Sequence, residues 1–293
     1  MLGFEPLSDH IGVRVTGLDP TRPIAAADAD TLREALRRHR LLLLRQGPIV
    51  EADHVRLMAA LGNVIVEASG RGAVSYVTAG PDGYVAGATR ILFHSDGQFT
   101  DFGALQAISL YATAMERDEP TIFADMVAAT RRLPAELRAL VAERDIMQCV
   151  DLSLYYETGR YRLSAKSPLT PEEQFGRSIH PMLGKHRDTG EEMLNVSELF
   201  TSHVVGMDDE ESDRLFDMLA RYQYDPEYLY CHHWQLDDLV IWDNLALQHS
   251  RDALDAPSGR TLRRVSINPY DNAAMQAGLR AAPAAVPGFG EGW

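Results

Sequence analysis

The chain has few cysteines and no long apolar run. Two cysteines, Cys149 and Cys231, occur among 293 residues, so one disulfide could form but a disulfide framework could not. No stretch approaches the roughly 20 apolar residues that cross a bilayer. The first five residues lack the basic flank and apolar run of a signal peptide. We therefore expect a reduced, cytoplasmic protein without a membrane partner.

Positive charge is also scarce. The chain has 28 Lys and Arg against 42 Asp and Glu, a formal net charge of -14. An acidic surface argues against non-specific binding to nucleic acid or to an anionic membrane. No glycine-rich phosphate loop lies between a strand and a helix. We therefore expect no nucleic-acid partner, while an anionic small-molecule substrate and a homo-oligomer stay open.

Short strand-like segments dominate the middle and the end of the chain. Apolar or alternating patterns predict strands, and period-3.6 patterns predict helices. The expected strands include 11–18, 41–44, 104–114, 239–242 and 262–269, and the expected helices are 28–39, 51–61, 134–144 and 208–221. This order favours a mainly β fold with flanking helices around a jelly-roll core.

A candidate metal site comes from His94-Ser95-Asp96 and the distant His249. Two histidines and one carboxylate can form a facial triad that leaves open positions on a non-haem Fe(II). If residues 94–96 form a strand, His94 and Asp96 face the same side. His249 follows the apolar strand 239–242, where an edge or loop position is expected. Zinc hydrolases use the same donor types, so the triad alone leaves the metal open.

Two arginines, Arg260 and Arg264, follow the distal histidine at +11 and +15. In a strand over 261–267, positions 260, 262 and 264 share one face. Two inward guanidiniums require an anion, and the guanidinium fork suits a carboxylate. The alternative is a pair of surface arginines that bind Asp252 or Asp255.

Taken together, these residues resemble the TauD/TfdA family of Fe(II)/2-oxoglutarate-dependent dioxygenases. The family's His-x-Asp is met by His94 and Asp96, and its distal histidine after Trp-Asp-Asn is met by His249. The resemblance covers most of the chain, from Ile11 to about Pro269. It implies a double-stranded β-helix core, Fe(II) at the triad, and 2-oxoglutarate and O2 as co-substrates.

The resemblance also assigns residues to the two organic ligands. It implies that Thr121, Arg260 and Arg264 bind 2-oxoglutarate, and that Arg90, Phe200 and Arg264 are candidate substrate residues. An anionic substrate is favoured if Arg90 and Arg264 both face the cavity. The chain departs from the family where Asp118-Glu119-Pro120 replaces the common Gly-Gly-Asp before Thr121.

We therefore expect a single catalytic jelly-roll domain over 1–280, with an N-terminal α/β cap, and a flexible tail over 281–293. The expected reaction is oxidation, by default hydroxylation, of a small organic substrate with release of succinate and CO2. Two alternatives remain: a zinc-dependent hydrolase at the same triad, and a non-catalytic jelly-roll protein that binds a metal or ligand.

Overall fold

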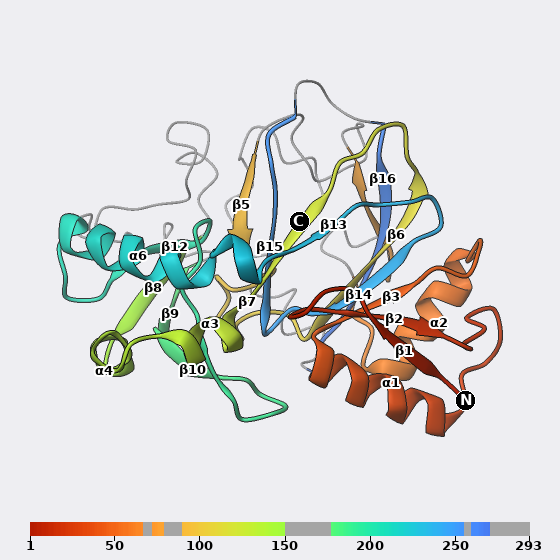
Figure 1. Cartoon of the computed structure of the whole chain (residues 1–293), viewed down its shortest axis with the longest axis horizontal. Helices are drawn as coiled ribbons and strands as arrows, with labels where there is room; N and C mark the ends of the chain where they lie inside the picture. Colours follow the sequence, from red (N-terminus) through yellow and green to blue (C-terminus); the bar gives the residue numbers. More distant parts are fainter. Residues whose placement is uncertain (67–71, 79–89, 150–176, 255–258, 270–293) are drawn as a thin grey trace.

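Two sheets of different size organise the structure. The computed structural model describes residues 1–66, 72–78, 90–149, 177–254 and 259–269 (Figure 1). The larger sheet has seven strands in the order β1-β2-β3-β14-β6-β16-β4. Its strands are β1 (Gly3–Pro6), β2 (Val13–Thr16), β3 (Leu41–Leu44), β4 (Ser75–Thr78), β6 (Ala107–Ala114), β14 (Leu239–Asp243) and β16 (Thr261–Ile267).

The smaller sheet has four antiparallel strands in the order β13-β7-β15-β5. Its strands are β5 (Ile91–His94), β7 (Thr121–Asp125), β13 (Tyr230–His232) and β15 (Leu247–Arg251). Two minor sheets are also present. These contain β8 (Asp145–Cys149), β9 (Arg177–Pro181) and β12 (Thr201–Val204) in one, and β10 (Leu183–Lys185) and β11 (Glu192–Leu194) in the other.

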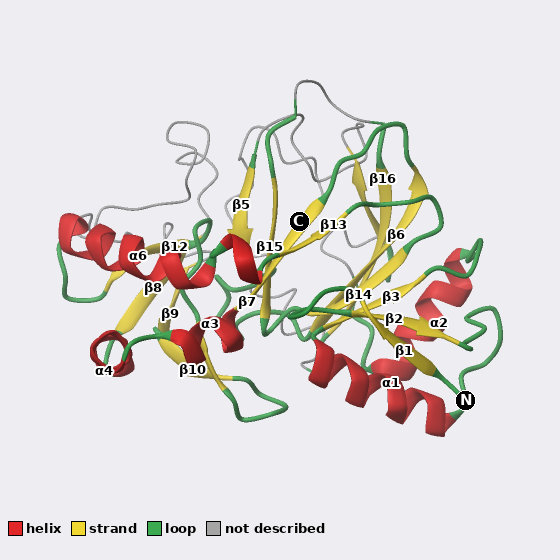
Figure 2. Ribbon diagram, in the orientation of Figure 1, coloured by secondary structure: helices red, strands yellow, loops and turns green. Residues whose placement is uncertain are grey.

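Helices gather at two sides of these sheets, as Figure 2 shows. The helices are α1 (Ala26–His39), α2 (Glu51–Leu61), α3 (Met126–Arg132), α4 (Ala135–Ala142), α6 (Asp209–Gln223) and the 3-10 helix η2 (Pro226–Tyr228). Both α3 and α6 begin at an aspartate, Asp125 and Asp208, whose side chain accepts main-chain N–H bonds of the first turn, as an N-cap should. In the described part of the chain, no helix combines the length and apolar character needed to cross a bilayer.

The N-terminal segment does not stand apart from the rest of the fold. Strand β3 pairs antiparallel with β14 and parallel with β2, so the first three strands extend the larger sheet. The predicted strand 11–18 is shorter, at Val13–Thr16, and β1 at Gly3–Pro6 was not predicted. The predicted tail over 281–293 lies outside the described residues.

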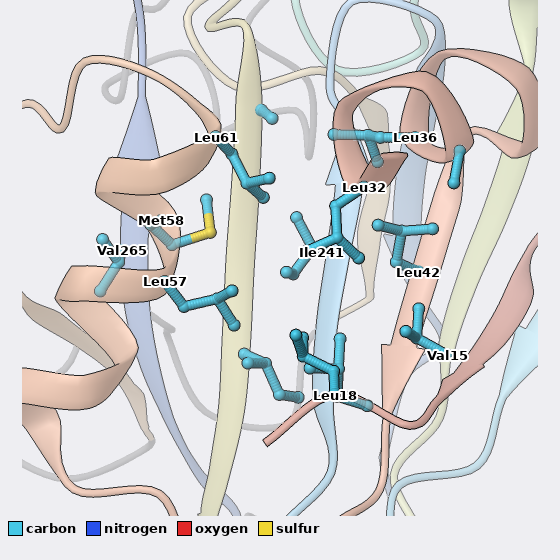
Figure 3. Close-up of a cluster of buried hydrophobic side chains, with 14 of the residues drawn as sticks. Val15, Leu18, Leu32, Leu36, Leu42, Leu57, Met58, Leu61, Ile241 and Val265 are labelled. Carbon is cyan, nitrogen blue, oxygen red and sulfur yellow. The ribbon is translucent and has the colours of Figure 1, made fainter. Parts of the chain in front are cut away.

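The apolar strand β3 explains how the larger sheet is covered on both faces. All four of its leucines are buried, as expected for a strand between two layers. Leu42 and Leu44 join a core with α1 and α2, whereas Leu41 and Leu43 face the other way, into a core that contains Phe123 of β7. Figure 3 shows the first of these cores. The second lies between the two sheets, which together form the jelly-roll core.

Candidate active site

The neighbouring strands β5 and β15 bring two histidines together. The antiparallel register places His94 opposite His249, and their ring centroids lie 4.3 Å apart. One donor atom from each of His94, Asp96 and His249 lies within 4.8 Å of the others. Among the described residues, no other group of three histidine, cysteine or acidic side chains has this spacing.

Asp96 reaches this cluster from a turn, not from a strand. Strand β5 ends at His94, so the expectation that residues 94–96 form a strand was wrong. The buried Asn244 side chain fixes the turn: its Oδ1 accepts from the Asp96 N–H at 3.1 Å, and its Nδ2 donates to the Asp96 carbonyl at 3.0 Å. This pair of bonds replaces strand pairing and sets where the carboxylate starts.

His249 also lies elsewhere than the sequence suggested. It is the third residue of β15, between β7 and β5, whereas an edge or loop position was expected. Only a short turn after Asp243 separates β14 from β15, so the chain re-enters the sheet structure before it reaches His249. A central strand holds the imidazole more rigidly than a loop would.

The ring nitrogens of both histidines are consistent with a metal site. The Nδ1 of His94 donates to the Leu92 carbonyl at 2.8 Å, which leaves Nε2 on the side of Asp96, 3.3 Å from Oδ1. A bond from the second ring nitrogen to a carbonyl is typical of metal-binding histidine. The Nδ1 of His249 is buried and has no hydrogen-bond partner among the described residues. The donor set therefore fits a metal ion.

The protonation states of Asp96 and His249 also suit a metal ion. Burial opposes ionisation of Asp96, but Arg264 and the two histidines outweigh it and hold the pKa of the Asp96 carboxyl well below its ordinary value. Burial and the neighbouring His94 lower the pKa of His249 to about 3. At neutral pH the site thus has a carboxylate and a neutral His249 imidazole, the forms that bind metals.

Arg264 lies on the same side of β16 as predicted. Its Nη1 is 2.8 Å from Oδ2 of Asp96, and its neighbour two residues back, Leu262, is fully buried in the core between the sheets. Arg263 faces the opposite side. The period of two in the sequence therefore located these side chains correctly.

Arg260 is buried and bound to an acidic residue of the chain itself. Its Nη1 donates to the Glu119 carbonyl at 2.6 Å, and its Nη2 lies 2.8 Å from Glu119 Oε1. Arg251 Nη1 lies 2.7 Å from the same Oε1. Burial, opposed by Glu119, lowers the pKa of Arg260 to about 10, so the guanidinium stays charged at neutral pH. The alternative of an arginine on the surface is wrong for Arg260, which is 6 % exposed.

Thr121 opens β7 close to this cluster in sequence. Its side chain is buried, and its Oγ1 accepts a 3.0 Å hydrogen bond from the indole N–H of Trp234. Thr121 and Phe123 share a face of β7, and the Phe123 ring centroid lies 6.3 Å from that of His249. Thr121 therefore faces the space between the two sheets.

Known proteins resemble this chain in sequence and in fold. The model of the family described as "Taurine catabolism dioxygenase TauD, TfdA family" matches residues 3–266. The chain belongs to this family. It is 28 % identical over 194 residues to pentalenolactone F synthase of Streptomyces arenae, covering 62 % of each chain. It is 27 % identical over 179 residues to an alpha-ketoglutarate-dependent 2,4-dichlorophenoxyacetate dioxygenase of Burkholderia sp., covering 60 % of this chain and 57 % of the relative.

These two matches thus span less than two thirds of each curated relative. A solved structure, AAD-2 in complex with Mn(II) and N-oxalylglycine, superposes with a TM-score of 0.75 and 21 % identity over 92 % of this chain and 98 % of that one. This likeness shows that the two chains share a fold.

The structure places the two predicted substrate residues Phe200 and Arg90 differently: Phe200 lies beside the His94 ring, and Arg90 directly precedes β5. Phe200 is buried and meets the His94 ring edge-on at 5.5 Å between centroids. Arg90 is half exposed, and its Nη2 lies 3.4 Å from Glu198 Oε2. A substrate acid at Arg90 would therefore compete with Glu198.

Sequence reasoning on this TauD/TfdA chain missed three residues that hold the site. Asn244 was visible as the last residue of Trp-Asp-Asn, but its bonds to Asp96 were not foreseen. Glu119 was noticed only as a departure before Thr121, and Arg251 was passed over although it lies two residues after His249. The spacing of two from His249 was the available signal, because it puts Arg251 on the ligand's face of the strand.

Proposed function

We propose that the protein is an Fe(II)- and 2-oxoglutarate-dependent oxygenase that hydroxylates a small organic substrate and releases succinate and CO2. The observation that carries this proposal is the convergence of His94, Asp96 and His249 within 4.8 Å. Membership of a dioxygenase family supports it. When bound, iron and 2-oxoglutarate would supply the oxidation, by reaction with O2.

The chain's own residues would prepare this centre. His94 and His249 offer neutral imidazole, and Asp96 offers a carboxylate that Arg264 keeps ionised. Two histidines and a carboxylate are a donor set that suits Fe(II), whereas structural zinc sites commonly use thiolates. Asp96 would fill the third metal-ligand position with a side chain of the protein itself. Phe200 packs against His94 and excludes water from that side of the ring.

The co-substrate would lie between the triad and the start of β16. We assign its distal carboxylate to Arg260 and Thr121, which are both buried. A guanidinium and a hydroxyl together offer the donors that a carboxylate needs. Arg264, which contacts Asp96, would serve the keto-acid end of 2-oxoglutarate or an acidic group of the substrate.

The substrate side combines an aromatic wall with arginines. Phe200 and Phe99, with ring centroids 5.1 Å apart, would pack against an apolar part of the substrate. Arg90 and Arg264 would favour an anionic group on it. The acidic net charge and the low cysteine content, two among 293 residues, support action in the cytoplasm on a small molecule.

The test is to supply purified protein with Fe(II), 2-oxoglutarate and a panel of small carboxylates, sulfonates and neutral compounds. We expect O2 uptake and succinate release that rise with one class of compound. Hydrolysis of a panel compound with zinc, without O2 or 2-oxoglutarate, would support the hydrolase alternative. Ligand binding without any turnover would support a binding protein.

A further inference from the structure

A buried ion cluster surrounds the arginine assigned to the co-substrate. Glu119, Arg251 and Arg260 are 3 %, 5 % and 6 % exposed. Both guanidiniums converge on one oxygen, Glu119 Oε1, at 2.7 Å and 2.8 Å. The arginine that is to receive a carboxylate from a ligand thus already has a carboxylate from the chain.

The cluster lies where the two sheets meet. Arg251 ends β15, two residues after His249, and Arg260 directly precedes β16 of the larger sheet. Glu119 precedes Thr121, the first residue of β7. Glu119 is therefore close in sequence to one assigned co-substrate residue and in ionic contact with the other.

We propose that Glu119 is a specificity-determining residue of the co-substrate site, an internal carboxylate that competes with the distal carboxylate of a 2-oxo acid for Arg260. This inference rests on the proposed function. In this chain Glu119 occupies a position within the Asp118-Glu119-Pro120 departure from Gly-Gly-Asp, and glycine could not supply such a carboxylate.

The physical reason is the repulsion between like charges in one site. A second carboxylate that reaches Arg260 shares the guanidinium with Glu119, and two carboxylates that share a site disfavour one another. Removal of the negative charge of Glu119 leaves Arg251 and Arg260 with more positive potential in a buried region, where such charges are weakly screened. A ligand dianion then gains more than a monoanion of the same length.

The test compares 2-oxoglutarate with 2-oxopentanoate, which has the same keto acid and a methyl group in place of the distal carboxylate. Calorimetry on Mn(II)-loaded full-length protein without O2 gives both dissociation constants without turnover. For E119Q we expect the preference for 2-oxoglutarate over 2-oxopentanoate to rise about tenfold above that of the unaltered protein. CO2 release with Fe(II) and O2 should shift in the same direction.

The matched control is D118N, the same acid-to-amide change one residue earlier. Asp118 is 57 % exposed on its side chain and lies 2.7 Å from Nδ1 of His233, so D118N should leave the preference unchanged. If melting curves show that E119Q does not fold, E119D retracts the carboxylate from Arg260 by one methylene group. E119D should then raise the preference in the same direction.

An unchanged or lower preference in the folded variant, E119Q or E119D, overturns the role of Glu119 while the unaltered protein still binds and decarboxylates 2-oxoglutarate. If the unaltered protein neither binds nor decarboxylates either 2-oxo acid, the proposed function fails, and this inference fails with it.

Discussion

Two consecutive arginines on β16, Arg263 and Arg264, lie on opposite faces of the larger sheet and differ in what holds them. Arg263 is buried, and its direct contacts are uncharged: its Nε donates to Nδ1 of His54 at 3.2 Å, its Nη2 donates to the Ile49 carbonyl at 2.6 Å, and its guanidinium lies 4.6 Å from the centroid of the Tyr111 ring. Arg264 meets the carboxylate of Asp96. The same residue type therefore connects α2 to the sheet on one side and sets charge at the candidate metal centre on the other.

The face of the strand on which an arginine lies, more than its residue type, therefore decides whether it stabilises the fold or acts at the candidate site. In the outer network around Arg263, each hydrogen bond of His54 has a definite donor and acceptor. Ser109 Oγ donates to the Val265 carbonyl at 2.8 Å, so it accepts from Nε2–H of His54 at 2.7 Å, while Nδ1 accepts from Arg263. His54 must be neutral in this network. The inner side keeps ionised groups together, which a bound ligand can use.

The largest expected effect is on the inner side. We predict that Asp96→Ala abolishes substrate-dependent succinate formation, because one of the three donors is lost. Without metal the melting temperature should fall only through the loss of the Asp96–Arg264 ion pair, since the Asp96 main chain still bonds to Asn244. Succinate assays and melting curves on the same preparation check both parts, and near-normal turnover would reject the triad.

The next largest effect is expected at Arg260, the arginine assigned to 2-oxoglutarate. We predict that Arg260→Ala raises the concentration of 2-oxoglutarate required for turnover. The rise should correspond to a loss of about 2–5 kcal/mol of binding free energy, the usual cost of losing one member of a buried charge-assisted pair. Saturation curves for 2-oxoglutarate measure the effect. An unchanged requirement would remove Arg260 from the co-substrate role.

The paired variants Arg263→Met and Arg264→Met sharpen the comparison directly. We predict that Arg263→Met lowers the free energy of unfolding by about 2–4 kcal/mol, because His54 Nδ1 and the Ile49 carbonyl lose their donor, while activity per folded molecule is kept. Arg264→Met should lose activity with the smaller change in stability. Urea unfolding beside turnover assays checks this; the reverse pattern would contradict the division of roles.

The smallest expected effect is the pH dependence of the outer network. Burial, together with Arg263, lowers the pKa of His54 from 6.5 to about 3. Between these values the unfolded chain binds a proton that the folded chain does not, so stability falls as pH falls below 6.5. At pH 5 the contribution of His54 should be about 2 kcal/mol less than at pH 7.

The matched measurement is urea unfolding of the unaltered protein and His54→Gln across pH 7 to 5. The difference between their free energies of unfolding should shrink by that amount as pH falls, because glutamine does not titrate. A constant difference would show that the pKa of His54 is the same in the folded and unfolded states, and would contradict the predicted lowering.

Much of the fold followed from local patterns. The run Leu41–Leu44 predicted a strand buried on both faces, and the helix over 51–61 has the predicted ends. Alternation placed Arg264 inside and Arg263 outside. These predictions succeeded because strand and helix periods, turn residues and apolar runs act over a few residues.

The parts that failed depend on contacts between distant segments. Asp96 is placed by Asn244, which lies 148 residues away in sequence, and Glu119 meets Arg251 across 132 residues. Such pairings follow from how the two sheets lie together, and no local pattern encodes them. The types of the donor residues could be read from the sequence, whereas their supports required the structure.

The register between β5 and β15 has one more consequence. Because His94 and His249 are cross-strand partners, their separation is built into the spacing of adjacent strands. A shift of β15 by one residue would turn Gln248 toward the centre and His249 away from it. Insertions in the surface connections of this fold can therefore leave the imidazole pair undisturbed, while a single insertion within β15 would erase it.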